Sequence, residues 1–62
     1  MIHSSAQIDS SAEIDDGVSI GPYTVIGPNV KIKSGTVIEG NAFVHKNTFI
    51  GKNNLIYPFA SV

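Results

Sequence analysis

One spacing dominates the sequence: a β-branched aliphatic residue returns every six positions along the whole chain. The series has no exception and contains eleven residues: Ile2, Ile8, Ile14, Ile20, Ile26, Ile32, Ile38, Val44, Ile50, Ile56 and Val62. A period of six matches neither the 3.6 residues of a helical turn nor the period of two of an isolated strand. It is typical of a coil with short strands as its sides, and it predicts an all-β chain built as a parallel β-helix of hexapeptide repeats.

If three hexads make one triangular turn, residues 18 apart stack, and the 62 residues form about three and a half coils. The eleven aliphatic residues then pack in three interior columns, because stacked strands lie only ~4.8 Å apart. Side chains alternate along a strand, so the residue two before each aliphatic also faces inward. These residues are mostly small: Ala6, Ala12, Val18, Thr24, Val30, Thr36, Ala42, Thr48, Asn54 and Ala60. The amide among them, Asn54, needs a backbone or water partner.

The corners of the coil are predicted two and three residues after each aliphatic. Six of the ten third residues are Gly or Asn, which tolerate left-handed backbone angles. Pro22, Pro28 and Pro58 occupy the second residue, as expected at the first position of a turn. One corner column differs, with Ser5, Tyr23, Asn41 and Phe59. Its aromatic residues predict that this corner packs against another surface.

The outward residues separate the three faces of the coil. One face stacks Lys31 over Glu13 and Lys33 over Asp15, opposite-charge pairs typical of a solvated surface. The other two faces carry apolar residues outward: Val37 and Leu55 on one, and Val25 and Phe43 on the other. Soluble monomers rarely expose such patches. We therefore expect these two faces and the Tyr23/Phe59 corner to be partly buried against neighbouring subunits.

Composition excludes several classes of protein. The net charge is −1 and only four Lys and Arg are present, so no basic surface for nucleic acid exists. The apolar runs are too short for a transmembrane helix, so we expect no stable membrane insertion, and no signal peptide is visible. There is no cysteine to form a disulfide or a thiolate metal site. We expect a cytoplasmic protein. Because the hexads run without a capping unit, we also expect residues 1–62 to be the N-terminal coils of one longer β-helix domain.

The sequence singles out no catalytic, substrate-binding or metal-ligating residue, and it indicates no cofactor. His3 and His45 each follow an inward aliphatic, and their separation places them outward on different faces, which disfavours a shared metal site. The Gly-Pro pairs at 21–22 and 27–28 are turn chemistry, because no glycine-rich phosphate-binding motif leads from a strand into a helix. We expect both histidines to be surface or interface residues.

The repeat resembles that of the hexapeptide-repeat acyltransferase superfamily, which implies a left-handed parallel β-helix and a homotrimer. Within it, MIHSSAQIDSSAEIDDGVSIGPYTVIGPNVKI, SGTVIEGNAFV and above all GKNNLIYPFASV are similar to the N-terminal part of the bacterial acyl-carrier-protein–UDP-N-acetylglucosamine O-acyltransferases. The specific element is residues 54–61. The resemblance implies transfer of a 3-hydroxyacyl chain from acyl-carrier protein to the 3-hydroxyl of UDP-N-acetylglucosamine, the first step of lipid A biosynthesis. Neither histidine matches the catalytic motif of that family, so this stretch is expected to supply scaffold and subunit contacts.

Three alternatives remain. The chain could belong to another hexapeptide-repeat acyltransferase or acetyltransferase. A zinc enzyme resembling the carbonic anhydrases of this superfamily would need three histidines around a subunit interface. A non-catalytic structural or ice-binding β-helix would need an outward ladder of threonine, whereas Thr24, Thr36 and Thr48 fall at inward positions. We expect the isolated 62 residues to be inactive, and to be aggregation-prone or partly folded because the last coil exposes strand edges.

Overall fold

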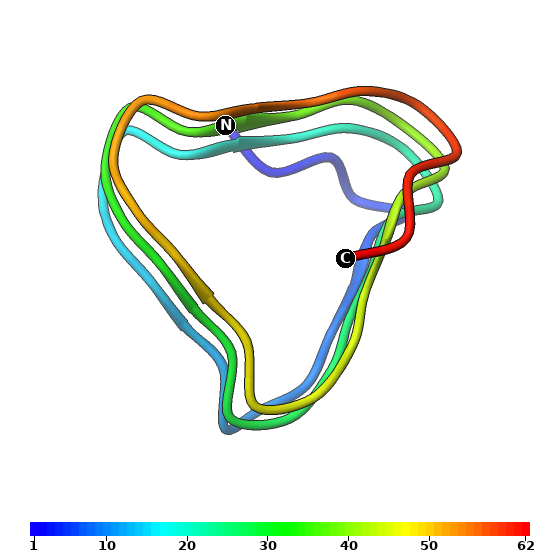
Figure 1. Ribbon diagram of the computed structural model, residues 1–62. Coiled ribbons are helices and arrows are strands. Elements are labelled where there is room, and N and C mark those ends of the chain that lie inside the picture. Colours follow the sequence, from blue (N-terminus) through cyan, green and yellow to red (C-terminus); the bar gives the residue numbers. More distant parts are fainter.

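The computed structural model describes residues 1–62 and contains strands and turns but no helix. Nine strands of two residues each form three parallel sheets, ordered β1-β4-β7, β2-β5-β8 and β3-β6-β9. The strands are β1 (Gln7–Ile8), β2 (Glu13–Ile14), β3 (Ser19–Ile20), β4 (Val25–Ile26), β5 (Lys31–Ile32), β6 (Val37–Ile38), β7 (Phe43–Val44), β8 (Phe49–Ile50) and β9 (Leu55–Ile56). Viewed along the coil axis, the sheets are the sides of a triangle (Figure 1). The predicted parallel β-helix is confirmed.

Each strand from β1 to β6 pairs with the strand one coil further along the chain. Ile8 is in register with Ile26, and Ile26 with Val44. The same 18-residue register pairs Ile14 with Ile32 and Ile20 with Ile38. Bridges between Ile2 and Ile20 and between Phe43 and Ser61 extend the pattern beyond the named strands. The three predicted columns are therefore present, and backbone hydrogen bonds run between successive coils.

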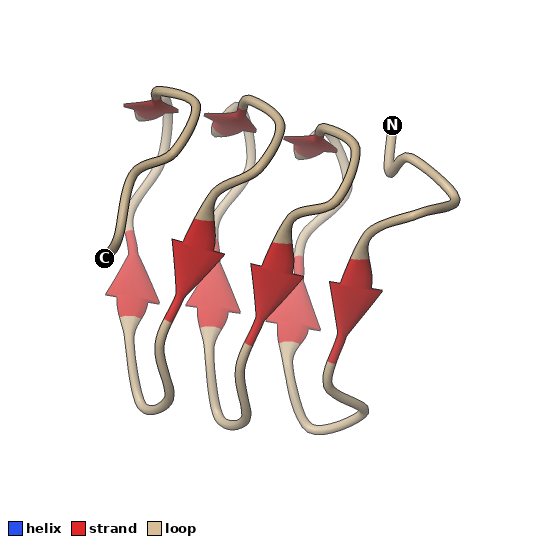
Figure 2. Cartoon of the chain, turned by 90° about the vertical axis from the view of Figure 1, so that its right-hand side faces the viewer, coloured by secondary structure: helices blue, strands red, loops and turns tan.

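The coil is left-handed, as the family resemblance implies. In Figure 1 the chain turns clockwise, and the quarter-turn to Figure 2 shows that its C-terminal coils are nearer the viewer of Figure 1. A path that turns clockwise while it approaches the viewer is left-handed. Parallel crossovers in ordinary sheets are right-handed in ~98% of cases because of strand twist. Strands of two residues have little length over which to twist, so the preference for right-handed crossovers is weak in this fold.

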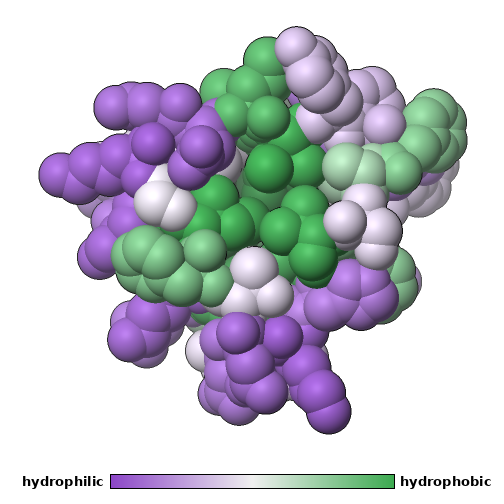
Figure 3. Space-filling view, viewed as in Figure 1, coloured by the Kyte–Doolittle hydropathy of each residue, from purple (hydrophilic) through white to green (hydrophobic).

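The core fills the inside of the triangle. Nine hydrophobic residues are buried: Val18, Ile20, Ile26, Val30, Ile32, Ile38, Ala42, Val44 and Ile50. Two buried threonines are satisfied by the backbone, since the Thr36 hydroxyl donates to the Gly51 carbonyl at 2.7 Å and that of Thr24 to the Glu39 carbonyl at 3.4 Å. Asn54 was predicted to face inward but is exposed, because no further coil covers it in residues 1–62, and it donates its amide to the Gly51 carbonyl at 3.1 Å. Figure 3 shows the apolar centre of one end, with polar residues around much of its edge.

The corners have the predicted turn geometry at eight of the ten positions. Positive φ angles occur at Gly17, Tyr23, Asn29, Gly35, Asn41, Asn47, Asn53 and Phe59. Ser5 and Ser11 are the exceptions, and their hydroxyls instead accept the backbone N–H groups of Tyr23 and Asn29 one coil further on, at 3.0 and 2.9 Å. A left-handed conformation costs a residue with a side chain roughly 1–2 kcal/mol. Tyr23 and Phe59 are thus strained aromatic residues at one corner.

The outward faces carry the predicted contrast with two differences. Lys33 forms an ion pair with Asp15 at 3.8 Å, whereas Lys31 is in register with Glu13 but no ion pair joins them. The same face also carries Phe49, an exposed aromatic. Val37, Phe43 and Leu55 are about half exposed on the other two faces, and the aromatic corner is open. No helix long and apolar enough to cross a membrane is present.

Candidate functional site

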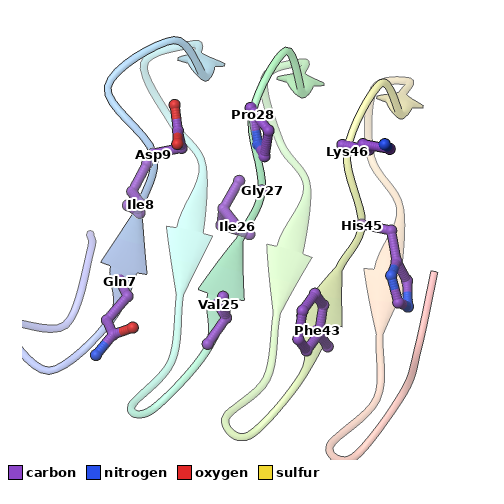
Figure 4. Close-up of a pocket in the computed structure, with 10 residues that line it drawn as sticks. All are labelled: Gln7, Ile8, Asp9, Val25, Ile26, Gly27, Pro28, Phe43, His45 and Lys46. Carbon is purple, nitrogen blue, oxygen red and sulfur yellow. The ribbon is translucent and has the colours of Figure 1, made fainter.

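The outer side of the sheet β1-β4-β7 is hollowed. The hollow has a volume of about 560 Å³ and opens to the outside. Its lining residues come from three successive coils: Gln7, Ile8, Asp9, Val25, Ile26, Gly27, Pro28, Phe43, His45 and Lys46. Figure 4 shows them in rows across the sheet, with Gln7, Val25 and Phe43 in one row, and Asp9, Gly27 and His45 in the next. The strands therefore supply an apolar wall, and the residues that follow them supply the polar rim.

Gly27 forms the floor of the hollow. It lies between Asp9, one coil before it, and His45, one coil after it, and it has no side chain. A Cβ atom at this position would lie 3.1 Å from the backbone nitrogen of Lys46 and 3.2 Å from the carbonyl carbon of His45. The absent side chain thus exposes the backbone of the following coil to the hollow.

Asp9 is at one end of the hollow and is held by its own turn. One oxygen of its carboxylate, Oδ1, accepts the Ser11 backbone N–H at 2.9 Å and the Ser11 hydroxyl at 2.8 Å. The backbone hydrogen bond, and then the side-chain one, lower the pKa of Asp9 below its ordinary value of 3.8. A lowered pKa means that the carboxylate stabilises the fold above the unfolded-state pKa, and that this contribution is lost as the pH falls through the folded-state value.

Replacing Ser11 by alanine is expected to raise the pKa of Asp9 toward 3.8, because the hydroxyl is lost while the backbone N–H remains. The stabilisation that the ionised Asp9 carboxylate provides, which is lost below about pH 4, should then be lost at a higher pH. NMR titration of the Asp9 carboxyl carbon measures the first effect directly. Ser10→Ala is the matched control, because no hydrogen bond joins Ser10 to Asp9. An unchanged Asp9 pKa in Ser11→Ala would contradict the assignment.

His45 is at the other end of the hollow, at its rim. Its ring stacks on Phe43, with the ring centroids 4.6 Å apart and the planes 24° from parallel. Its Nε2 lies 2.7 Å from the Ser61 hydroxyl, and its backbone N–H donates to the Val62 carbonyl at 2.9 Å. The side chain is exposed, as its outward position predicts.

Lys46 contributes two donors to the same end. Its backbone N–H makes no hydrogen bond within the chain, whereas the N–H groups of His45 and Asn47 on either side are both bonded. An unpaired N–H is general at this corner position: Pro22, Pro28 and Pro58 have none to pair, and the N–H groups of Ser34, Gly40 and Lys52 are also unbonded. What distinguishes Lys46 is that its backbone nitrogen lies beside the space that Gly27 leaves open, while its side chain carries an ammonium group.

His3 lies on a different face from His45, as predicted. Its backbone N–H donates to the Ile20 carbonyl, which places it on the sheet that contains β3. Its Nδ1 lies 2.8 Å from the Ser5 hydroxyl and accepts the Ser5 backbone N–H at 3.1 Å. No group of three His, Cys, Asp or Glu side chains is placed to hold a metal ion.

The arrangement is suited to binding rather than to nucleophilic catalysis. The Ser61 hydroxyl and the His45 imidazole are at hydrogen-bond distance, but nothing bonds the Nδ1 atom of His45. A nucleophile and its base ordinarily need a third group that orients the base. The hollow instead combines an apolar wall with one carboxylate and one ammonium group.

Sequence reasoning named no residue of this hollow as a site. The available signal was the stacked series Asp9, Gly27 and His45, spaced 18 apart, in which one member lacks a side chain. The contact between His45 and Ser61 spans 16 residues, so it is diagonal to the column and is absent from the stacking pattern.

Comparison with known proteins identifies the fold family. The family model described as the GMPPB C-terminal domain matches residues 1–62. No curated protein matches the chain significantly. The hexapeptide repeat and the left-handed coil agree with the family match, while the narrower resemblance to the lipid A O-acyltransferases stays a prediction. The chain belongs to the GMPPB C-terminal domain family, within the hexapeptide-repeat superfamily of left-handed parallel β-helices.

Proposed function

We propose that these coils are a rigid assembly scaffold, through which copies of the protein associate as a homotrimer. The observation that supports this most is the set of outward apolar residues on two of the three faces. Leu55 is 51% exposed and Phe43 47% exposed, whereas the inward residues of the same two sheets, such as Ile38 and Val44, are buried. Tyr23 is 70% exposed and Phe59 82% exposed at the corner between these faces. Exposed apolar ladders of this kind mark protein interfaces.

Charging one of these faces should therefore weaken association. Replacing Val37 and Leu55 together by lysine places like charges in register on β6 and β9, which a covered face does not tolerate. Sedimentation of the complete gene product should show a shift from trimer to monomer, and Phe49→Lys should leave the trimer intact. Phe49 is the control because it is also an exposed apolar residue, but lies on the face with the Lys33–Asp15 ion pair. The opposite pattern would reject this choice of faces.

The activity that we propose for the protein containing this scaffold is acyl transfer from acyl-carrier protein to the 3-hydroxyl of UDP-N-acetylglucosamine, in the cytoplasm. The support is the resemblance of residues 54–61 to the corresponding stretch of the lipid A O-acyltransferases. Incubating the complete gene product with 3-hydroxyacyl-acyl-carrier protein and UDP-N-acetylglucosamine, followed by mass spectrometry, tests it. The expected product is the 3-O-acylated sugar nucleotide. Failure to form it would leave the second candidate, a β-helix module without acyl transfer, which the match to a family of C-terminal domains favours.

A further inference from the structure

We propose that the hollow on the β1-β4-β7 face binds a small amphipathic anion. A carboxylate or phosphate group is held at Lys46, by its ammonium group and its free backbone N–H, while the apolar part of the ligand lies on Val25 and Phe43. The proposed trimer would cover this same face, so the ligand and a neighbouring subunit compete for Val25 and Phe43. The site itself needs neither acyl transfer nor trimer formation.

The space fits a ligand of this size. Small-molecule sites have volumes of roughly 300–1,000 Å³, and the hollow has about 560 Å³. It exists because Gly27 has no side chain between Asp9 and His45. The ligand would therefore lie across three coils of the scaffold, on strands that backbone hydrogen bonds hold in register.

The anion is assigned to the Lys46 end on two grounds. The backbone N–H of Lys46 has no partner within the chain, and the space beside it is open only because Gly27 lacks a Cβ. The ammonium group of the same residue adds a charge-assisted donor, which is the stronger class of hydrogen bond to an oxyanion. One residue therefore supplies two donors at this end of the hollow, which His45 also lines.

Asp9 fixes the orientation of the ligand. It lies two coils from His45 in the same row, about 10 Å away at the usual strand spacing. A carboxylate already bonded to Ser11 at that end repels a second anion there. The titratable groups that face the hollow are Asp9, His45 and Lys46, and they are arranged with opposite charges at opposite ends. A ligand with one anionic head thus has one favourable direction.

The apolar wall accounts for the rest of the ligand. Phe43 is held by its stacking on His45, and Val25 lies next to it in register on β4. An alkyl chain or a ring that lies along this row would cover side chains that are otherwise in contact with solvent.

The experiment compares three probes with the same six-carbon chain: hexanoate, hexyl phosphate and hexan-1-ol. Saturation-transfer NMR on the complete gene product gives their affinities, measured also in the Val37→Lys/Leu55→Lys form so that association does not compete. We expect at least one anion to bind at least ten times more tightly than the alcohol, and the tighter anion identifies the head group. Equal binding of all three probes would overturn the proposal. If the protein proves to lack acyl transfer or to be monomeric but still binds the anion selectively, the proposed function fails and the anion site remains supported.

Two substitutions separate the donors at Lys46. Lys46→Gln removes the charge and keeps the N–H, and should weaken anion binding three- to tenfold. Lys46→Pro removes both the charge and the N–H, and should weaken anion binding further. Proline is compatible with the turn, because it occupies the same position at three other corners. Lys52→Gln and Lys52→Pro are the matched controls at the same position of another corner, outside the hollow, and should change nothing. If Lys46→Pro fails to fold, Lys46→Gln decides. Anion binding that is the same in Lys46→Gln and Lys52→Gln would contradict the assignment.

Discussion

Truncating Ile32 to alanine is expected to lower the free energy of unfolding by about 2–5 kcal/mol. Ile32 lies in the middle of the column formed with Ile14 and Ile50, and its side chain is 0% exposed. The lost methyl and methylene groups leave a cavity, because the strands above and below are held apart by backbone hydrogen bonds. Glu13 and Lys31, on the outer side of the same strands, cannot turn inward to fill it. Urea denaturation of the complete gene product measures the loss.

Ile14→Ala is the matched control. It removes the same atoms from the same column, but Ile14 lies in the first coil and is only partly buried. No complete coil precedes the residues around Ile14, so they can relax into the space that the truncation leaves. The loss in the free energy of unfolding should therefore be clearly smaller than at Ile32. Equal losses at the two positions would contradict a core in which each coil is covered by the next.

The fold was predictable because its determinants are local and repeated. A hexad needs one aliphatic residue, one small residue and one corner, and the register of Ile20 with Ile38 follows once three hexads make a turn. The hand was not predictable from the period, because the same residues satisfy a left-handed or a right-handed coil equally. It came from the resemblance. The strain at Tyr23 and Phe59 also lay outside the pattern, since the rule for corners favours Gly or Asn there.

The hollow was not predictable in the same way. It depends on a missing side chain at Gly27 and on a free N–H at Lys46, two features that belong to neighbouring coils. The hexad rule treats Gly27 as half of an ordinary Gly-Pro turn. Whether that glycine opens a cavity is decided by what lies above and below it, and stacking alone does not describe the diagonal contact of His45 with Ser61.

A series of glycine-to-alanine substitutions should give the second large effect. A Cβ atom at Gly21 would lie 2.6 Å from the backbone nitrogen of Gly40 and 2.9 Å from its Cα atom. Both atoms belong to the main chain of the next coil, so no side chain can turn away to relieve the contact. The corner must open, and overpacking of this kind costs about 1–3 kcal/mol. We expect Gly21→Ala to lower the melting temperature markedly and to raise hydrogen exchange at residues 38–41.

Gly27 grades the effect by distance. There the nearest atom to a new Cβ is the Lys46 nitrogen at 3.1 Å, which a shift of a few tenths of an ångström would relieve, so Gly27→Ala should cost less than Gly21→Ala. Both glycines follow an inward isoleucine in the same hexad position. A difference in stability between the two variants therefore reports how closely successive coils approach at each site, and equal effects would show that conformational freedom rather than packing requires glycine there.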